Sequence, residues 1–174
     1  NQSGADGLAA NATATDVFTY TVSDGAGTTD TATLTITVKG VGPVGSADTA
    51  TATESQTLSV NAAGGVLTND TGGDTESLAV TNVSSNGTSN SGAAGAGVLG
   101  TYGTLTIGAD GSYSFAATTA AADALGAGES ATDTFVYTLS DGTEITTANL
   151  TITVLGANAA PVALDDSGTV NEDA

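Results

Sequence analysis

The feature that most constrains the fold of this 174-residue chain is an internal repeat. The segment DVFTYTVSDG from Asp16 returns as DTFVYTLSDG from Asp133, and TATLTITV from Thr31 returns as TANLTITV from Thr147. The match continues between PVGSADTATATES, which starts at residue 43, and PVALDDSGTVNED, which starts at residue 161. Equivalent residues stay about 117 positions apart. The repeating structural unit is therefore roughly that long.

The repeat predicts three segments. Residues 1–42 are the C-terminal part of one repeat, residues 43–160 are a complete repeat, and residues 161–174 are the start of the next. Two identical chains cannot complete each other head to tail, because the part of the unit equivalent to residues 57–121 would still be missing. We therefore expect this chain, which has no Met, to be a segment of a longer tandem array.

Each unit is predicted to consist of strands joined by tight turns. In TATLTITV, apolar residues alternate with Thr at a period of two, which is typical of a half-buried strand. Together with the preceding aromatic segment and its Ser-Asp-Gly turn, it predicts an antiparallel hairpin in each copy. A second hairpin is predicted within residues 102–115, where Leu105 and Ile107 face Tyr113 and Phe115.

The other segments give weaker patterns. Short strands are expected at residues 49–53, 56–60 and 77–83, a short helical turn within 116–125, and a mobile loop at 84–97. About seven strands with turn-like connections in roughly 117 residues predict an all-β fold, a two-layer antiparallel β-sandwich.

The charge balance excludes several functions. Nineteen acidic residues face a single base, Lys39, and there is no His, so nucleic acid is not an expected partner. No apolar run approaches the roughly 20 residues that a membrane-spanning helix needs, so membrane insertion is not expected. Because Cys is also absent, the commonest general base and the thiol nucleophile are both missing, and we expect no enzyme.

Five motifs in order resemble a known family. They are APVALDDSGTVNED, GVLTNDTGGDTESLAVTNV, YGTLTIGADGSYSF, LGAGESATDTFVYTLSDG and ANLTITVLGAN. They are similar to the VCBS and cadherin-like tandem repeats of very large bacterial, RTX-type surface adhesins. The resemblance implies Ig/cadherin-like sandwiches in series, secretion to the bacterial cell surface, and calcium near the junctions between repeats. The chain departs from that pattern at Lys39 to Val44, KGVGPV, which has neither Asn nor Asp and so lacks the side-chain oxygens of such a junction.

Calcium takes six to eight oxygen ligands, several of them carboxylates. The densest supply is the C-terminal group Asn158, Asp165, Asp166, Glu172 and Asp173. A second group is Asp70, Asp74 and Glu76, and a third is Asp48 with Glu54. The alternative is that these are solvated loop acids, since no EF-hand spacing is present. The acids of the pairs Asp24-Gly25, Asp110-Gly111 and Asp141-Gly142 are interpreted as turn residues rather than ligands.

The predicted function is a non-catalytic spacer of an extracellular bacterial adhesin, stiffened by calcium and supporting cell adhesion or biofilm formation. Its partners would be neighbouring repeats of the same polypeptide, with a cell-surface glycan or protein bound through another domain. Two alternatives remain open. One is a sandwich that binds a glycan or protein directly, through loops such as residues 84–97, and the other is a subunit of an extracellular filament or surface layer.

Overall fold

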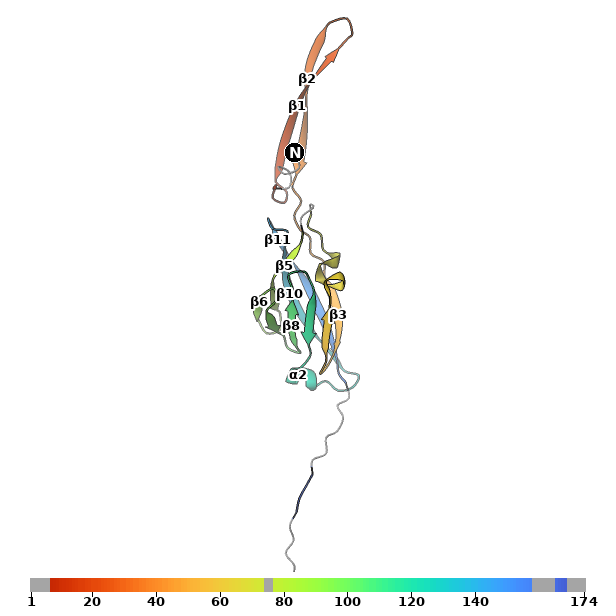
Figure 1. The fold of residues 1–174 in the computed structure, drawn as a ribbon, viewed down its shortest axis with the longest axis vertical. Helices are drawn as coiled ribbons and strands as arrows, with labels where there is room; N and C mark the ends of the chain where they lie inside the picture. The colour runs from red at the N-terminus through yellow and green to blue at the C-terminus, as the bar shows by residue number, and fades with distance from the viewer. Residues whose placement is uncertain (1–6, 74–76, 158–164, 169–174) are drawn as a thin grey trace, which may run out of the picture.

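The computed structural model describes residues 7–73, 77–157 and 165–168. A hairpin of two long strands is followed by a sandwich of two sheets, and the hairpin extends from one end of the sandwich (Figure 1). The hairpin strands are β1 (Thr13–Ser23) and β2 (Thr29–Lys39). The five-stranded sheet has the order β3 (Asp48–Thr53), β11 (Ile145–Leu155), β10 (Ser130–Ser140), β5 (Ala79–Ser85) and β6 (Ser91–Ala93). The four-stranded sheet has the order β4 (Thr57–Val60), β9 (Tyr113–Ala116), β8 (Thr104–Ile107) and β7 (Gly97–Leu99).

Three short helical segments complete the described structure: η1 (Ala62–Gly64), η2 (Val66–Asn69) and α2 (Ala120–Asp123). The predicted helical turn is confirmed as α2, whose first turn is capped by the Thr119 hydroxyl accepting from the N–H of Ala122. None of the helices in the described ranges is long or apolar enough to span a membrane. The all-β sandwich predicted from the strand pattern is confirmed.

The core lies between the two sheets because alternate residues of each strand point inward. Fully buried residues on β10 and β11 meet fully buried residues on β8 and β9. They include Phe135, Tyr137, Leu139, Leu150, Ile152 and Val154 on one side and Leu105, Ile107 and Phe115 on the other. Phe115 and Phe135 pack edge to face, with ring centroids 6.1 Å apart and planes at 71°.

The outer face of the five-stranded sheet carries rows of threonine. Thr134 lies opposite Thr151, which in turn lies opposite Thr49 on the next strand. Cross-strand threonine pairs of this kind stabilise a sheet by a few tenths to about 1 kcal/mol each. The strands of this sheet therefore place apolar residues inward and Thr outward, which accounts for the threonine-rich composition.

The predicted register of the second hairpin is confirmed, because Leu105 pairs with Phe115 and Ile107 with Tyr113. The expectation of an entirely antiparallel sandwich is wrong at one pair. β3 runs parallel to β11, from Asp48 opposite Leu150 to Thr53 opposite Leu155. The segment that opens the unit thus lies beside the strand that closes it, and such strands need a long connection rather than a turn.

The expectation of a mobile loop at residues 84–97 is also wrong. Its middle and end form the short edge strands β6 and β7, which pair with β5 and β8 respectively. Val98 on β7 is buried in the core, and Gly92 on β6 pairs with Val83. Small residues allow this close packing but give no apolar period, so the strands leave little trace in the sequence.

The two copies of the repeated hairpin have the same register. Phe18 pairs with Leu34 as Phe135 pairs with Leu150, and Tyr20 pairs with Ala32 as Tyr137 pairs with Ala148. The predicted structural equivalence of the two copies is confirmed for these strands. Their environments differ, because every residue of β1 is exposed whereas alternate residues of β10 are buried.

Candidate functional site: buried acids in the complete unit

The first concentration of polar atoms surrounds the hydroxyl of Tyr137. Its Oη atom lies 2.8 Å from Asp48 Oδ2 and 2.9 Å from Asp70 Oδ2. The carbonyl oxygens of Ser46 and Val66 lie 3.1 and 3.2 Å from the same atom. We call these five residues the tyrosine cluster. It joins β3, β10 and the segment around η2, so acids that are 22 positions apart in the chain meet at one side chain.

One hydroxyl hydrogen serves four acceptors in this cluster, which leaves negative charge only partly compensated. Burial raises the pKa of the Asp48 carboxyl above its ordinary value; the hydrogen bond from Tyr137 opposes that rise, and the nearby charge of Asp70 adds to it. Burial and the bonds to both carboxylates raise the pKa of the Tyr137 hydroxyl far above its ordinary value. Tyr137 is therefore a permanent donor, and the cluster ties the start of β3 to the core.

A second buried acid, Glu54, lies at the other end of β3. The side chain is 6% exposed, and its Oε2 atom has no hydrogen-bond partner among the described residues. Its backbone N–H donates to the carbonyl of Leu155 at 2.9 Å, so the residue is held beside the end of β11. We call this end of the sandwich, where β11 finishes, the C-terminal pole.

A buried carboxylate oxygen without a donor is strongly unfavourable, because desolvation is not repaid by a hydrogen bond. The neighbouring groups at this pole are also oxygen-rich. The Ser55 hydroxyl donates to Asp123 Oδ1 at 3.5 Å, and the N–H of Gly156 donates to the carbonyl of Glu129 at 2.9 Å. A bound cation such as calcium is one kind of partner that would compensate the Glu54 Oε2 oxygen.

The predicted calcium ligands are distributed as follows. Asp48 and Glu54 share one face of β3 but stand at its two ends, about 20 Å apart for six residue steps, so they cannot hold one ion together. Asp70 joins Asp48 in the tyrosine cluster. Asp165 and Asp166 are exposed. Asn158, Glu172, Asp173, Asp74 and Glu76 lie outside the described residues, so the groups that contain them stay predictions.

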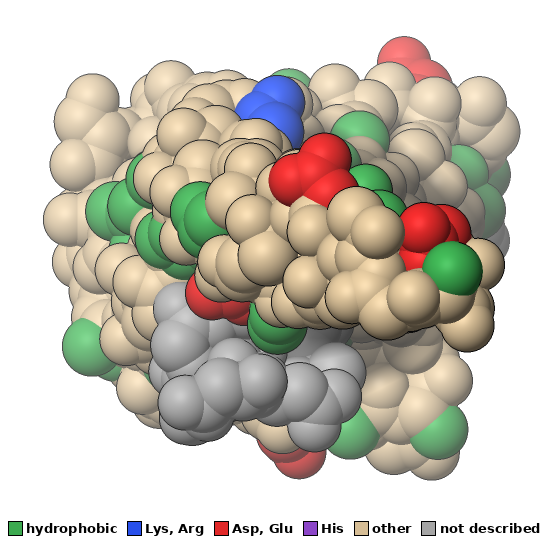
Figure 2. Space-filling view, turned by 90° about the horizontal axis from the view of Figure 1, so that it is seen from above, with side chains coloured by type: hydrophobic (Ala, Val, Ile, Leu, Met, Phe, Trp, Pro, Cys, Tyr) green, Lys and Arg blue, Asp and Glu red, His purple; other side chains and the backbone are tan. Residues whose placement is uncertain are grey.

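No group of three or more acidic side chains is gathered within the described part of the chain. Figure 2, which views the molecule along its long axis, likewise shows acidic side chains as separate patches on that face. A metal site built from the described residues would therefore combine an acid of one segment with oxygens from another.

Sequence reasoning missed Asp133, a buried acid with a structural task. Its two oxygens accept the backbone N–H groups of Thr101 and Tyr102 at 2.9 and 2.8 Å, and the side chain is 3% exposed. The signal was present, because the pattern D-x-F-x-Y places the acid in the same inward row as the aromatics. A charged residue in an apolar row indicates a bonded partner across the core.

The interpretation of the Asp-Gly pairs as turn residues is confirmed. Asp141 Oδ1 accepts the N–H groups of Thr143 and Glu144 at 2.8 and 2.7 Å, while Gly142 adopts φ 101°. In the first copy, Asp24 Oδ1 accepts the N–H of Ala26 at 2.8 Å. These bonds lower the pKa of both carboxyls, chiefly the backbone bond from Glu144 for Asp141 and that from Ala26 for Asp24.

Most of the chain matches known families of bacterial domains. Residues 41–156 match the family described as the bacterial cadherin-like domain, and residues 6–37 match the bacterial Ig domain. No curated protein matches the sequence. Among solved structures, an endo-fucoidan hydrolase, MfFcnA4 from glycoside hydrolase family 107, is 21% identical with a TM-score of 0.38, and a variant of it has a TM-score of 0.37. The alignment covers 88% of this chain but only 20% of the hydrolase chain. At this TM-score the similarity carries no information about activity.

Proposed function

The chain belongs to the bacterial cadherin-like domain family, and from this premise we propose that it is a segment of a non-catalytic, extracellular spacer in a bacterial surface adhesin. In this proposal residues 43–160 form one complete unit, residues 1–42 close the preceding unit and residues 161–174 open the next. The units are joined end to end and hold an adhesive domain away from the cell surface. Domains of the Ig and cadherin-like type are typically structural parts of surface proteins.

The observation that carries the proposal is the repeated hairpin. β1 and β2 have the pairing and the inward row of β10 and β11, yet Phe18 is 53% exposed where Phe135 is fully buried. The hairpin is therefore built to close a sandwich of the same kind. A chain of such units, each closed by its own hairpin, is an extended structure.

The chemistry of the unit supports a structural task. Asp133 accepts two backbone N–H groups, and Asp48 and Asp70 accept the Tyr137 hydroxyl in the tyrosine cluster, so all three acids are engaged in structural hydrogen bonds. The sequence has no His and no Cys. The pairing of β6 and β7, which form part of residues 84–97, with β5 and β8 weakens the alternative that this segment is a loop that binds a glycan.

Calcium at the C-terminal pole is the second part of the proposal. Glu54 offers a buried oxygen that has no donor in the described part of the chain, and Asn158, Asp165, Asp166, Glu172 and Asp173 follow the end of β11 in the sequence. A cation held by Glu54 and by oxygens of that following segment would compensate the buried charge and couple the unit to its neighbour.

The calcium proposal is tested by thermal unfolding with calcium and with a chelator. Calcium should raise the midpoint of the wild-type chain, because it binds the folded state alone. Glu54→Gln should remove the calcium response, whereas the control Asp30→Asn, on the exposed hairpin, should keep it. An unchanged midpoint in calcium for the wild-type chain would refute the calcium site and leave the spacer proposal standing.

The spacer proposal has its own test. Small-angle scattering of a protein with two complete units in series should give a particle about twice as long as one unit, as expected for units that contact only their neighbours. A glycan array probed with the same protein should give no hits. Specific binding to a glycan, or ordered filaments of the chain alone in electron micrographs, would favour one of the two alternatives instead.

A further inference from the structure

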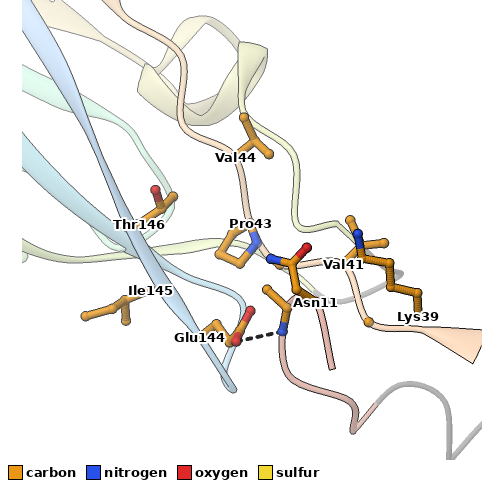
Figure 3. A pocket seen from close by; sticks show the side chains of 11 residues that line it. Asn11, Lys39, Val41, Pro43, Val44, Glu144, Ile145 and Thr146 are labelled. Carbon is orange, nitrogen blue, oxygen red and sulfur yellow. Dashed lines mark hydrogen bonds between the residues drawn. The ribbon is translucent and has the colours of Figure 1, made fainter. Parts of the chain in front are cut away.

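The segment that joins the hairpin to the sandwich forms a distinct joint. Residues 39–44, together with Ala10, Asn11 and Glu144, line a cavity of about 660 Å³ at the end of the sandwich opposite the C-terminal pole (Figure 3). We call this contact the first joint. It rests on the proposed division into units, because it connects the end of one unit to the start of the next.

Glu144 bridges the two sides of the first joint. Its Oε1 atom accepts the N–H of Ala10 at 2.8 Å, and Figure 3 shows this bond crossing from the sandwich to the loop before β1. That loop is in turn bonded to the end of β2, because the N–H of Asn11 donates to Gly40 at 3.0 Å and the N–H of Gly40 donates to Ala12 at 2.9 Å. The carboxylate therefore holds both strands of the hairpin through one loop.

The linker, the segment of residues 39–44 that joins the hairpin to the sandwich, is closely packed against its neighbours. A Cβ atom at Gly42 would collide with the Glu144 carboxylate and would lie 3.0 Å from the Ala10 side chain. On its other side, Gly73, at φ 86°, has no room for a Cβ against the Gly42 carbonyl. Val44 and Thr71 then exchange two backbone hydrogen bonds of 2.8 and 3.0 Å. The linker path is thus fixed on both sides.

The groups at this joint do not suit calcium. Glu144 is the only carboxylate among the described residues that line the cavity, one of its oxygens already accepts a hydrogen bond, and Lys39 lines the same space. The linker side chains of Gly40, Val41, Gly42 and Pro43 contain no oxygen. One shared carboxylate beside a cation is a poor basis for a site that takes six to eight oxygens, several of them carboxylates.

We propose that the first joint is a metal-independent latch, in which Glu144 grips the loop before β1 and fixes the orientation of the preceding unit. It differs in kind from the C-terminal pole, where one oxygen of the buried Glu54 has no donor among the described residues. The latch is also specific to one unit. The position equivalent to Glu144 in the first copy is Thr28, which makes the same backbone bonds to Asp24 as Glu144 makes to Asp141, so this position in the turn between β1 and β2 offers no carboxylate to the unit before it.

The test measures the distance between the two sides of the joint. Because the chain has no Cys, spin labels can be placed at Thr35→Cys on β2 and Asn149→Cys on β11, both exposed. Double electron–electron resonance should give a narrow distribution of label-to-label distances for the otherwise wild-type chain. The distribution should be the same in calcium and in chelator. Glu144→Ala should widen it at least about twofold, because the bond to Ala10 is lost.

Two further variants keep the result interpretable. Glu144→Gln retains an acceptor oxygen and should keep the narrow distribution, while Asp30→Ala removes a carboxylate far from the joint and should have no effect. Circular dichroism checks that the sandwich stays folded in each variant. A wild-type distribution that is broad, that narrows only with calcium, or that ignores Glu144→Ala would overturn the latch. None of these results would bear on whether the array is a spacer, which the glycan array and scattering decide.

Discussion

The hairpins β1–β2 and β10–β11 have nearly the same sequence and the same pairing, but only one of them is inside a sandwich. Phe135 and Tyr137 are fully buried, whereas Phe18 and Tyr20 are 53% and 51% exposed. Strand pairing and turn geometry are therefore local properties of this sequence. Burial is supplied by the rest of the unit.

The missing neighbours can be identified from the complete copy. β10 pairs with β5, β11 pairs with β3, and the four-stranded sheet covers their inward row. Neither edge of β1–β2 has such a partner in the described structure. A two-stranded sheet without a covered face is marginally stable at best, so hydrogen exchange should show β1 and β2 as much less protected than β10 and β11. Equal protection in a monomer would contradict the proposed division.

The largest expected difference between the copies is at the phenylalanines. Phe135→Ala should lower the free energy of unfolding of the sandwich by about 3–5 kcal/mol, because it leaves a cavity in a closely packed core. Phe18→Ala should change it by less than about 0.5 kcal/mol, as an exposed substitution does. Urea unfolding followed by circular dichroism measures both, and similar losses for the two variants would mean that the hairpin shares the core.

The aspartates of the D-x-F-x-Y pattern give the next contrast. Asp133→Asn should destabilise the sandwich by about 2–3 kcal/mol, since a buried amide cannot accept both N–H groups as the carboxylate does. Asp16→Asn, at the equivalent exposed position, should be close to neutral. The same urea titrations apply, and a neutral Asp133→Asn would show that the two backbone bonds are not required.

The tyrosines separate the copies by a smaller amount. Tyr137→Phe keeps the ring but removes the hydroxyl that bonds to Asp48 and Asp70, for an expected loss of about 1–3 kcal/mol. Tyr20→Phe is its matched control and should have no measurable effect. Equal behaviour of the two variants would refute the view that Tyr137 fastens Asp48 and Asp70.

The smallest effect is a pH dependence that only the complete unit should show. The pKa of Asp48 is raised in the folded state, so its contribution to stability is present below the ordinary carboxyl pKa and is lost as pH rises through the folded value. Asp48→Asn resembles the protonated side chain. The variant should therefore gain stability over the wild-type chain as pH rises from acid to neutral.

In both copies, the aspartates of the turns should give a pH dependence of stability with the opposite sign. Asp24 and Asp141 have lowered pKa values, so their contributions are present above the ordinary carboxyl pKa and are lost as pH falls through the folded values. The free energies of unfolding of the wild-type chain and of Asp48→Asn are compared across this pH range. Their difference isolates the contribution of Asp48. A difference between them that is constant with pH would exclude a raised Asp48 pKa.

Local patterns allowed both hairpins and the register of Leu105 against Phe115 to be predicted, because alternation and turn residues act over a few positions. The parallel pairing of β3 with β11 was not predictable in this way. It joins residues about a hundred positions apart, and each strand alone reads the same whichever neighbour it has.

The positions of the acidic residues show the same limit of prediction from local sequence patterns. Sequence clusters grouped Asp70 with Asp74 and Glu76, whereas the fold brings Asp70 to Asp48 through the hydroxyl of Tyr137. Glu54 gave no sign of its burial, because an acid after a run of Thr and Ala looks like the end of a strand. Its importance arises from the unpartnered oxygen, which is a property of tertiary packing alone.

The parallel pairing of β3 with β11 also determines how the unit would respond to mechanical load. The chain reaches the sandwich at the start of β3 and leaves it at the end of β11, at opposite ends of the sandwich (Figure 1). A stretching force on the array would pull the two strands past each other along their length. The hydrogen bonds between Asp48–Thr53 and Leu150–Leu155 would then be loaded together in shear, rather than opened one at a time as in a hairpin pulled at its ends. The strand that the sequence left unplaced is thus the one that would carry tension through the unit.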